Sequence, residues 1–204
     1  MGNIFTSKSF EELPKRVYHG TTADHIASLS KGIKVNTPSA NPSPDFGKGF
    51  YTTSQLKQAE VQAIRKTKFF QKQQNLIKSN IVTHPVVFEY TVDVEKLLKI
   101  TSVIKFDTPD EEWGKFIISN RLGIKVGSLH NFEQDIAAVF GPVADGHPFI
   151  GSVLNDYKKR IITLEELIIK LKPDFKNGYL PDQLSVHTEQ AADCLILQGV
   201  KAVK

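Results

Sequence analysis

The sequence predicts an α+β fold built on antiparallel sheets. Short segments with strand composition, rich in Val, Phe and Tyr, recur along the chain, and Pro85–Val92 is the clearest of them. Helices are expected between some of these strands but not others, so the regular strand–helix alternation of a parallel sheet is missing. Hydrophobic residues make up 40% of the 204 residues and charged residues 24%, which is ordinary for a globular chain with a buried core.

In the first half of the chain, turn residues separate the predicted elements. A strand is expected from Arg16, and the short helix after it ends near Gly32. A stretch rich in Asn, Ser and Pro then predicts a long loop. Ser54 is the expected N-cap of a basic helix that has one apolar side. The predicted elements are a strand at 16–19, a helix at 22–30, a loop at 36–44, a strand at 49–53 and a helix at 54–74.

The second half contains two clear helix starts. Thr108, followed by Pro109 and three acids, is typical of a capped first turn, and Thr163 with Glu166 forms a capping-box pattern. Apolar and β-branched segments between them predict strands. The predicted elements are strands at 85–92, 99–106, 135–143, 183–188 and 195–203, and helices at 108–121 and 163–172.

Length and composition indicate one domain at 15–204, preceded by a flexible N-terminal segment at 1–14. The net charge of +4 suits an anionic ligand. The single cysteine, Cys194, precedes an apolar run, so we expect a buried apolar residue and neither an internal disulfide nor a cysteine-based zinc site. The six histidines lack metal-ligand spacing, so no metal is predicted.

The sequence also bears on location. No apolar run approaches the roughly 20 residues that span a bilayer, and no secretory signal is visible, so we expect a cytoplasmic, reducing compartment. Gly2 and Thr6 fit the N-myristoylation pattern. One lipid chain would give weak membrane association if the protein is delivered into a eukaryotic host cell. The alternative for these residues is a disordered polar start.

Three short segments, far apart in sequence, are expected to form one site. They are Val-Tyr-His-Gly-Thr at 17–21, Asp-Phe-Gly-Lys-Gly-Phe-Tyr-Thr-Thr at 45–53 and Asp-Gln-Leu-Ser-Val-His-Thr at 182–188. In order and type they resemble the His-Tyr-Glu class of ADP-ribosyltransferases, which contains the poly(ADP-ribose) polymerases and the diphtheria-type toxins. This resemblance implies two packed, mostly antiparallel sheets around an NAD cleft with flanking helices, with NAD as a substrate.

The resemblance assigns roles to individual residues. His19 would hydrogen-bond the adenosine ribose, and the Gly20 backbone, which glycine leaves accessible, would hold the nicotinamide carboxamide. Tyr51 would stack on the nicotinamide ring. The structural alternatives are a turn histidine and a core tyrosine in a glycine-rich hairpin. The predicted catalytic residues are His19, Tyr51 and Gln183, and the predicted NAD-binding residues are His19, Gly20, Thr21, Gly49, Tyr51 and Asp145.

The third segment departs from the class at its catalytic position. Where the class has a Glu that binds the nicotinamide ribose 2′-hydroxyl, this chain has Gln183. A glutamine accepts a hydrogen bond but carries no charge, which favours single transfer over chain elongation. Glu189 is the alternative for this position. Asp182 has the wrong strand parity if Gln183 points inward.

A further segment extends the resemblance. Residues 135–145, with Trp113, Phe116, Asn120 and Arg121 upstream, resemble the family catalogued as domain of unknown function 3990, from about Tyr18 to Leu197. Asp135 and Asp145 would line the cleft or hold strand ends. Arg121 would bind the NAD phosphates or form a salt bridge at its helix end.

The basic helix also departs from the polymerase class. Its second stacking tyrosine and its serine correspond to Gln62 and Ala59 here, which predicts fewer contacts to nicotinamide unless Phe69 or Phe70 takes part. The class therefore implies a mono-ADP-ribosyltransferase that acts on a macromolecular acceptor, a protein in preference to a nucleic acid. A toxin or effector role, with an antitoxin or immunity partner, is an analogy. Two alternatives are an NAD-hydrolysing or NAD-binding protein of the same fold, and a nucleic-acid-binding domain that uses the basic helix.

Overall fold

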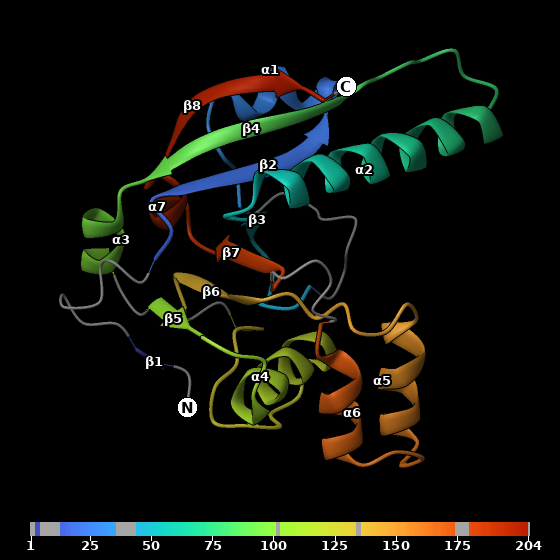
Figure 1. Ribbon diagram of the computed structural model, residues 1–204, viewed down its shortest axis with the longest axis vertical. Coiled ribbons are helices and arrows are strands. Elements are labelled where there is room, and N and C mark those ends of the chain that lie inside the picture. Colours follow the sequence, from blue (N-terminus) through green and yellow to red (C-terminus); the bar gives the residue numbers. More distant parts are fainter. Residues whose placement is uncertain are drawn as a thin grey trace.

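The fold is α+β, with one antiparallel sheet and one mixed sheet (Figure 1). The computed structural model describes residues 3–4, 13–35, 44–100, 103–133, 136–173 and 180–203. Most of the predicted flexible segment 1–14 and of the predicted loop 36–44 lies outside these residues, as does Asp135. Within them, no helix is long and apolar enough to cross a membrane.

The antiparallel sheet has the strand order β2-β4-β8. Its strands are β2 (Arg16–Thr22), β4 (Pro85–Val92) and β8 (Leu195–Ala202). The long helix α2 (Leu56–Leu76) crosses one face of this sheet, where Ala59 and Ala63 pack against Val87 (Figure 1). Small residues at a spacing of four bring the helix backbone close to the strands.

The mixed sheet has the order β1-β5-β6-β7-β3, in which only the β5–β6 pair is parallel. The strands are β1 (Asn3–Ile4), β5 (Val103–Lys105), β6 (Ala138–Pro142), β7 (Asp182–Val186) and β3 (Phe50–Thr52). Two residues of the predicted flexible segment thus pair with β5 as β1.

Two hydrophobic clusters hold these layers together. One lies between the sheets and includes Val17 and Phe88 from the first sheet and Leu184 and Val186 from the second. The other packs the mixed sheet against α4 (Glu111–Leu122), α5 (Ile150–Lys158) and α6 (Leu164–Leu171), and Trp113 is one of its fully buried members. The shorter elements are η2 (Ala23–His25), α1 (Ile26–Leu29), α3 (Val94–Ile100) and α7 (Glu189–Ala192).

The two sheets meet where β2 passes the end of β3. Tyr18 N donates to Thr53 O at 2.7 Å, and Thr53 N donates to Tyr18 O at 2.9 Å. Because β3 also pairs with β7, this bridge brings β2 next to the strand pair β3–β7. These are the three segments that the sequence singled out.

Several predicted element ends are corrected. Ser54 does not cap α2, because its hydroxyl and its backbone N–H both bind Asp182. Helix α4 begins later than predicted, with Asp110 in place of Thr108 as the N-cap. Part of the strand predicted at 99–106 belongs to α3, and α5 was not predicted. The capping box of Thr163 and Glu166 is confirmed.

Candidate functional site

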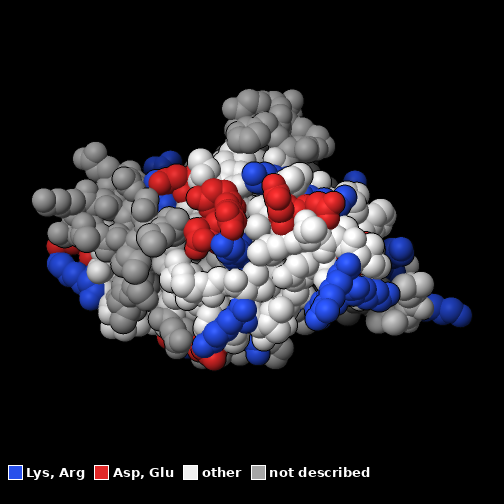
Figure 2. Space-filling model, turned by 90° about the horizontal axis from the view of Figure 1, so that it is seen from below, with Lys and Arg blue, Asp and Glu red and all other residues white. Residues whose placement is uncertain are grey.

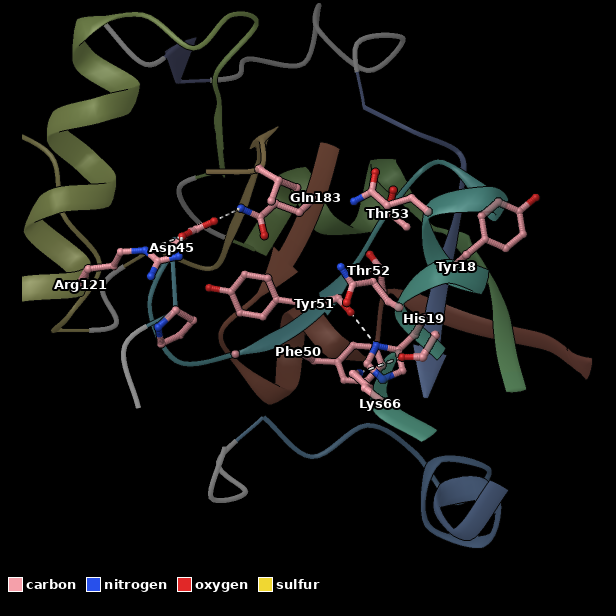
Figure 3. A pocket seen from close by; sticks show the side chains of 17 residues that line it. Tyr18, His19, Asp45, Phe50, Tyr51, Thr52, Thr53, Lys66, Arg121 and Gln183 are labelled. Atoms are coloured by element: carbon pink, nitrogen blue, oxygen red, sulfur yellow. Dashed lines mark hydrogen bonds and ion pairs between the residues drawn. The ribbon is translucent and has the colours of Figure 1, made fainter. Parts of the chain in front are cut away.

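A cavity of about 390 Å³ opens where β2, β3 and α2 meet (Figure 3). Five of the predicted site residues line it, and each comes from one of the three sequence segments. They are His19, Gly20, Gly49, Tyr51 and Gln183. The rest of the lining comes from β2, from β3 and the residues on either side of it, from α2, from the end of α4 and from the residue after β6: Tyr18, Pro44, Asp45, Phe50, Thr52, Thr53, Gln58, Ala59, Gln62, Lys66, Arg121 and Val143.

His19 has a fixed orientation and a fixed tautomer. Its Nδ1 lies 2.6 Å from the carbonyl oxygen of Tyr51, and its ring stacks on Phe50 with the centroids 4.4 Å apart. A carbonyl oxygen only accepts, so Nδ1 carries the proton and Nε2 is an acceptor in the neutral ring. Burial, helped by the nearby charge of Lys66, lowers the pKa of His19 to about 3. The cavity therefore holds a neutral imidazole at pH 7.

Gly20 is fixed by its contact with α2. A Cβ at this position would lie 1.9 Å from the carbonyl oxygen of Ala59, so only glycine fits between β2 and the helix. Strand alternation places the Gly20 N–H and C=O on the same edge as those of Tyr18, away from β4. The carbonyl oxygen accepts a hydrogen bond from Lys66 Nζ at 2.8 Å. Helix packing alone thus accounts for this glycine.

Tyr51 holds the glycine-rich loop that precedes β3 through hydrogen bonds. Its hydroxyl donates to Gly47 O at 2.6 Å and accepts from Phe46 N at 3.0 Å. Gly47 has φ +94°, which favours glycine, and a Cβ at Gly49 would lie 2.5 Å from Val186 O. Burial and the nearby Asp45 carboxylate raise the pKa of Tyr51, so its hydroxyl stays protonated. Both glycines are required by contacts within the chain.

Gln183 is held by a buried ion pair that the sequence did not predict. Arg121 contacts Asp45 Oδ1 through Nε at 2.7 Å and through Nη2 at 2.5 Å. Gln183 Nε2 donates to the other carboxylate oxygen at 2.9 Å, and Ala144 N donates to it at 3.2 Å. Asp45 and Gln183 are only 6% and 8% exposed. Figure 3 shows the Gln183 amide nitrogen turned to Asp45 and its amide oxygen turned away.

The other candidates for the catalytic carboxylate lie elsewhere. Asp182 accepts from Thr53 Oγ1 at 2.9 Å and from Ser54 N at 2.8 Å, consistent with the predicted parity in which Gln183 points inward. Glu189 sits in α7, accepts from Val35 N at 3.1 Å and does not line the cavity. Among these three residues, only Gln183 reaches the cavity.

Two predicted NAD-binding residues are placed outside the lining. Thr21 is buried, because its side chain points into the protein from β2, and Asp145 is exposed beyond the end of β6. The aspartate that reaches the cavity is Asp45, one hundred residues earlier. Its position directly before the glycine-rich Phe-Gly-Lys-Gly stretch was the available signal, but its partners come from distant parts of the chain.

A model described as "Protein of unknown function (DUF3990)" matches residues 16–197. The chain belongs to the DUF3990 family. A search of the curated proteins finds no match. The match confirms the predicted membership of DUF3990, and it includes every residue that lines the cavity. The resemblance to the His-Tyr-Glu class stays a prediction.

Helix α2 contributes one stripe of this DUF3990 domain to the cavity. Ala59, Gln62 and Lys66 follow at helical spacing, and all three line it. The first two are the positions at which the sequence predicted departures from the polymerase class. Phe69 is 60% exposed and does not replace the missing aromatic residue. Lys66 was not predicted, because its charge fitted a solvated face.

Outside the cavity lining, His187 connects β7 to the loop before β3 through hydrogen bonds. Its Nδ1 lies 2.7 Å from Lys48 O and its Nε2 lies 2.9 Å from Ser185 Oγ. His187 is 2% exposed, and burial lowers its pKa to about 4. The carbonyl fixes the proton on Nδ1, so the serine hydroxyl donates to Nε2. This pair is closed to solvent and positions the loop.

Metal chemistry finds no support in the described part of the chain. No group of three or more His, Cys, Asp or Glu side chains there could hold a metal ion. Cys194 is buried, as predicted, and burial raises the pKa of its thiol.

Proposed function

We propose that this protein binds NAD in the cavity, cleaves its bond to nicotinamide and transfers ADP-ribose to a macromolecule. The observation that carries the proposal is the convergence of the three segments on one cavity, with a neutral histidine, the backbone of Gly20 and a polar amide in its lining. The resemblance to the His-Tyr-Glu class gives these groups their roles.

His19 Nε2, as an acceptor, suits a ribose hydroxyl of the adenosine half. The Gly20 edge suits the nicotinamide carboxamide, which offers one donor group and one acceptor. The Nε2 of Gln183 is bonded to Asp45, and the amide oxygen remains as an acceptor. This oxygen suits the 2′-hydroxyl of the nicotinamide ribose. Tyr51 holds the loop that borders these positions.

The proposed reaction breaks the bond between ribose C1′ and the nicotinamide nitrogen. The bonding electron pair leaves with nicotinamide, which departs neutral because its ring is cationic in NAD. An electron pair of the acceptor then forms the new bond to C1′, and the acceptor releases a proton. The amide dipole of Gln183 stabilises the developing positive charge less than a carboxylate would, so slow single transfer is expected.

A test uses NAD labelled on its adenylate part, incubated with the protein and a cell lysate. We expect a labelled macromolecule with the wild type and with His147→Ala, a histidine outside the cavity, but not with His19→Ala. Treating the labelled product with protease or nuclease identifies the acceptor, which we propose is a protein. Absence of both label transfer and nicotinamide release in every lysate would contradict the proposal.

A second candidate, NAD hydrolysis or binding without transfer, is favoured by one observation. Among the described residues, the cavity lining has a single carboxylate, that of Asp45. Its charge is neutralised by Arg121. In this case the same assay yields free ADP-ribose without labelled acceptor, or NAD binding without turnover.

The nucleic-acid alternative depends on the basic residues of α2. Of the basic residues on α2, Lys57 pairs with Glu60 at 3.2 Å and Lys66 turns into the cavity. On the face around α4 and α6, acidic and basic side chains are mixed (Figure 2). Lys115, for example, contacts both Glu111 and Glu112. Arg65, Lys68 and Lys72 of α2 are exposed, so phosphate binding by this helix stays an alternative that a steep salt dependence of nucleic-acid binding would support.

A further inference from the structure

The charges in the cavity lining do not cancel. Among its described residues, the charged side chains are Asp45, Arg121 and Lys66. Arg121 and Asp45 form a close ion pair. Lys66 instead donates to a neutral acceptor, the carbonyl oxygen of Gly20. The lining therefore carries one positive charge, and that charge is on Lys66.

The ammonium group of Lys66 has hydrogen-bond donors left for a ligand. Its Nζ lies over β2, near the ring of His19 (Figure 3). Desolvation lowers the pKa of Lys66 to about 8. An ammonium group has three N–H donors, of which the Gly20 carbonyl takes one. Lys66 is an exposed residue that lines the cavity, so its two remaining donors are open to an anion that enters.

We propose that Lys66 is the anion-binding residue of the cavity and moves from the Gly20 carbonyl to a phosphate group when ligand binds. This rests on the proposed function insofar as the ligand is NAD, whose diphosphate supplies the anion. The movement has a second consequence: it releases the Gly20 carbonyl, an acceptor that a carboxamide needs. Lys66 thus binds one half of the ligand and frees an acceptor for the other half.

The test measures binding of three probes, ADP-ribose, pyrophosphate and nicotinamide, to the purified protein. In Lys66→Met we expect the Kd for ADP-ribose and for pyrophosphate to rise about tenfold or more, because a charged hydrogen bond is lost. Binding of nicotinamide, which has no phosphate, should be unchanged or tighter. Lys68→Met is the matched control, since Lys68 is an exposed lysine of the same helix outside the lining.

A second variant guards against a folding defect. Lys66→Gln removes the charge but keeps a donor for the Gly20 carbonyl, and it should lose pyrophosphate binding as Lys66→Met does. Thermal unfolding of each variant shows that the comparison is between folded proteins. If ADP-ribose and pyrophosphate bind equally well to the wild type and to both variants, the proposal is overturned.

Failure of this proposal is distinguishable from failure of the proposed function. NAD cleavage by the wild type with unchanged binding in both Lys66 variants would leave the function standing and remove the role of Lys66. Lys66-dependent binding of pyrophosphate without any binding of NAD would keep the anion site and remove the function. No binding of pyrophosphate or ADP-ribose to the wild type would overturn the role of Lys66.

Discussion

At the scale of single residues, the hydrogen bond between Gln183 and Asp45 determines which side chains position 183 tolerates. From sequence, a glutamate at this position would restore the catalytic carboxylate of the His-Tyr-Glu class. In the structure, the side chain at 183 lies against the Asp45 carboxylate, with 2.9 Å between Nε2 and Oδ2. A second carboxylate there would face the first, and like charges raise the pKa of one of the pair.

Gln183→Glu should therefore destabilise the protein at neutral pH by about 1–3 kcal/mol without raising NAD turnover. The deficit should shrink as pH falls toward about 5, because a raised carboxyl pKa in the folded state favours folding when the group is protonated. Urea unfolding of the variant and of the wild type, at neutral pH and at about pH 5, measures this deficit in the free energy of unfolding. The double variant Asp45→Asn, Gln183→Glu restores the pair with exchanged roles, and only this variant should gain turnover. Full stability and higher turnover in the single variant would contradict the prediction.

At the scale of elements, the close approach of α2 to β2 forms the back of the cavity. Gly20→Ala should lower the free energy of unfolding by about 2 kcal/mol or more, because its Cβ would enter the Ala59 backbone. For a chain of this size the melting temperature should fall by roughly 4–8 °C. The control is Gly199→Ala in β8, where a Cβ meets nothing within 4 Å. Equal melting temperatures for Gly20→Ala and Gly199→Ala would contradict the close contact between Gly20 of β2 and the Ala59 backbone of α2.

The elements also show which local signals suffice. The capping box at Thr163 was predicted correctly because both of its hydrogen bonds form within the first turn of α6. Ser54 fitted an N-cap equally well, but Asp182, 128 residues away, takes its hydroxyl and its N–H. Local sequence cannot show this competition, because it arises only when β3 pairs with β7.

At the scale of the whole molecule, two neutral histidines make stability depend on pH. The pKa of His19 is lowered to about 3 and that of His187 to about 4, below the ordinary value of 6.5. As pH falls below about 6.5, the unfolded chain binds these protons first. Unfolding is therefore favoured progressively down to about pH 4.

We expect the free energy of unfolding to be roughly 2–3 kcal/mol lower at about pH 5 than at about pH 7. Urea titrations at both pH values measure the difference. His187→Gln should reduce it by about half, whereas His147→Gln, outside the core, should not. Equal stability at the two pH values would mean that these rings are protonated as easily in the folded protein as in the unfolded chain.

The sequence predicted the α+β class and most strands, because composition and spacing encode them locally. The structure brings five residues of the sequence motifs, His19, Gly20, Gly49, Tyr51 and Gln183, to one cavity, and their roles there stay predictions. The parts it missed depend on tertiary contacts. Asp45 matters through Arg121 and Gln183, and Lys66 through Gly20, and none of these pairs is close in sequence.

The most direct test of the NAD site is calorimetric titration of the purified protein with NAD. We expect saturable binding by the wild type and by His147→Ala, and a Kd at least about tenfold higher for His19→Ala, which loses the acceptor on Nε2. Thermal unfolding confirms that His19→Ala is folded. Absence of binding by the wild type, or equal binding by His19→Ala, would contradict an NAD site in this cavity.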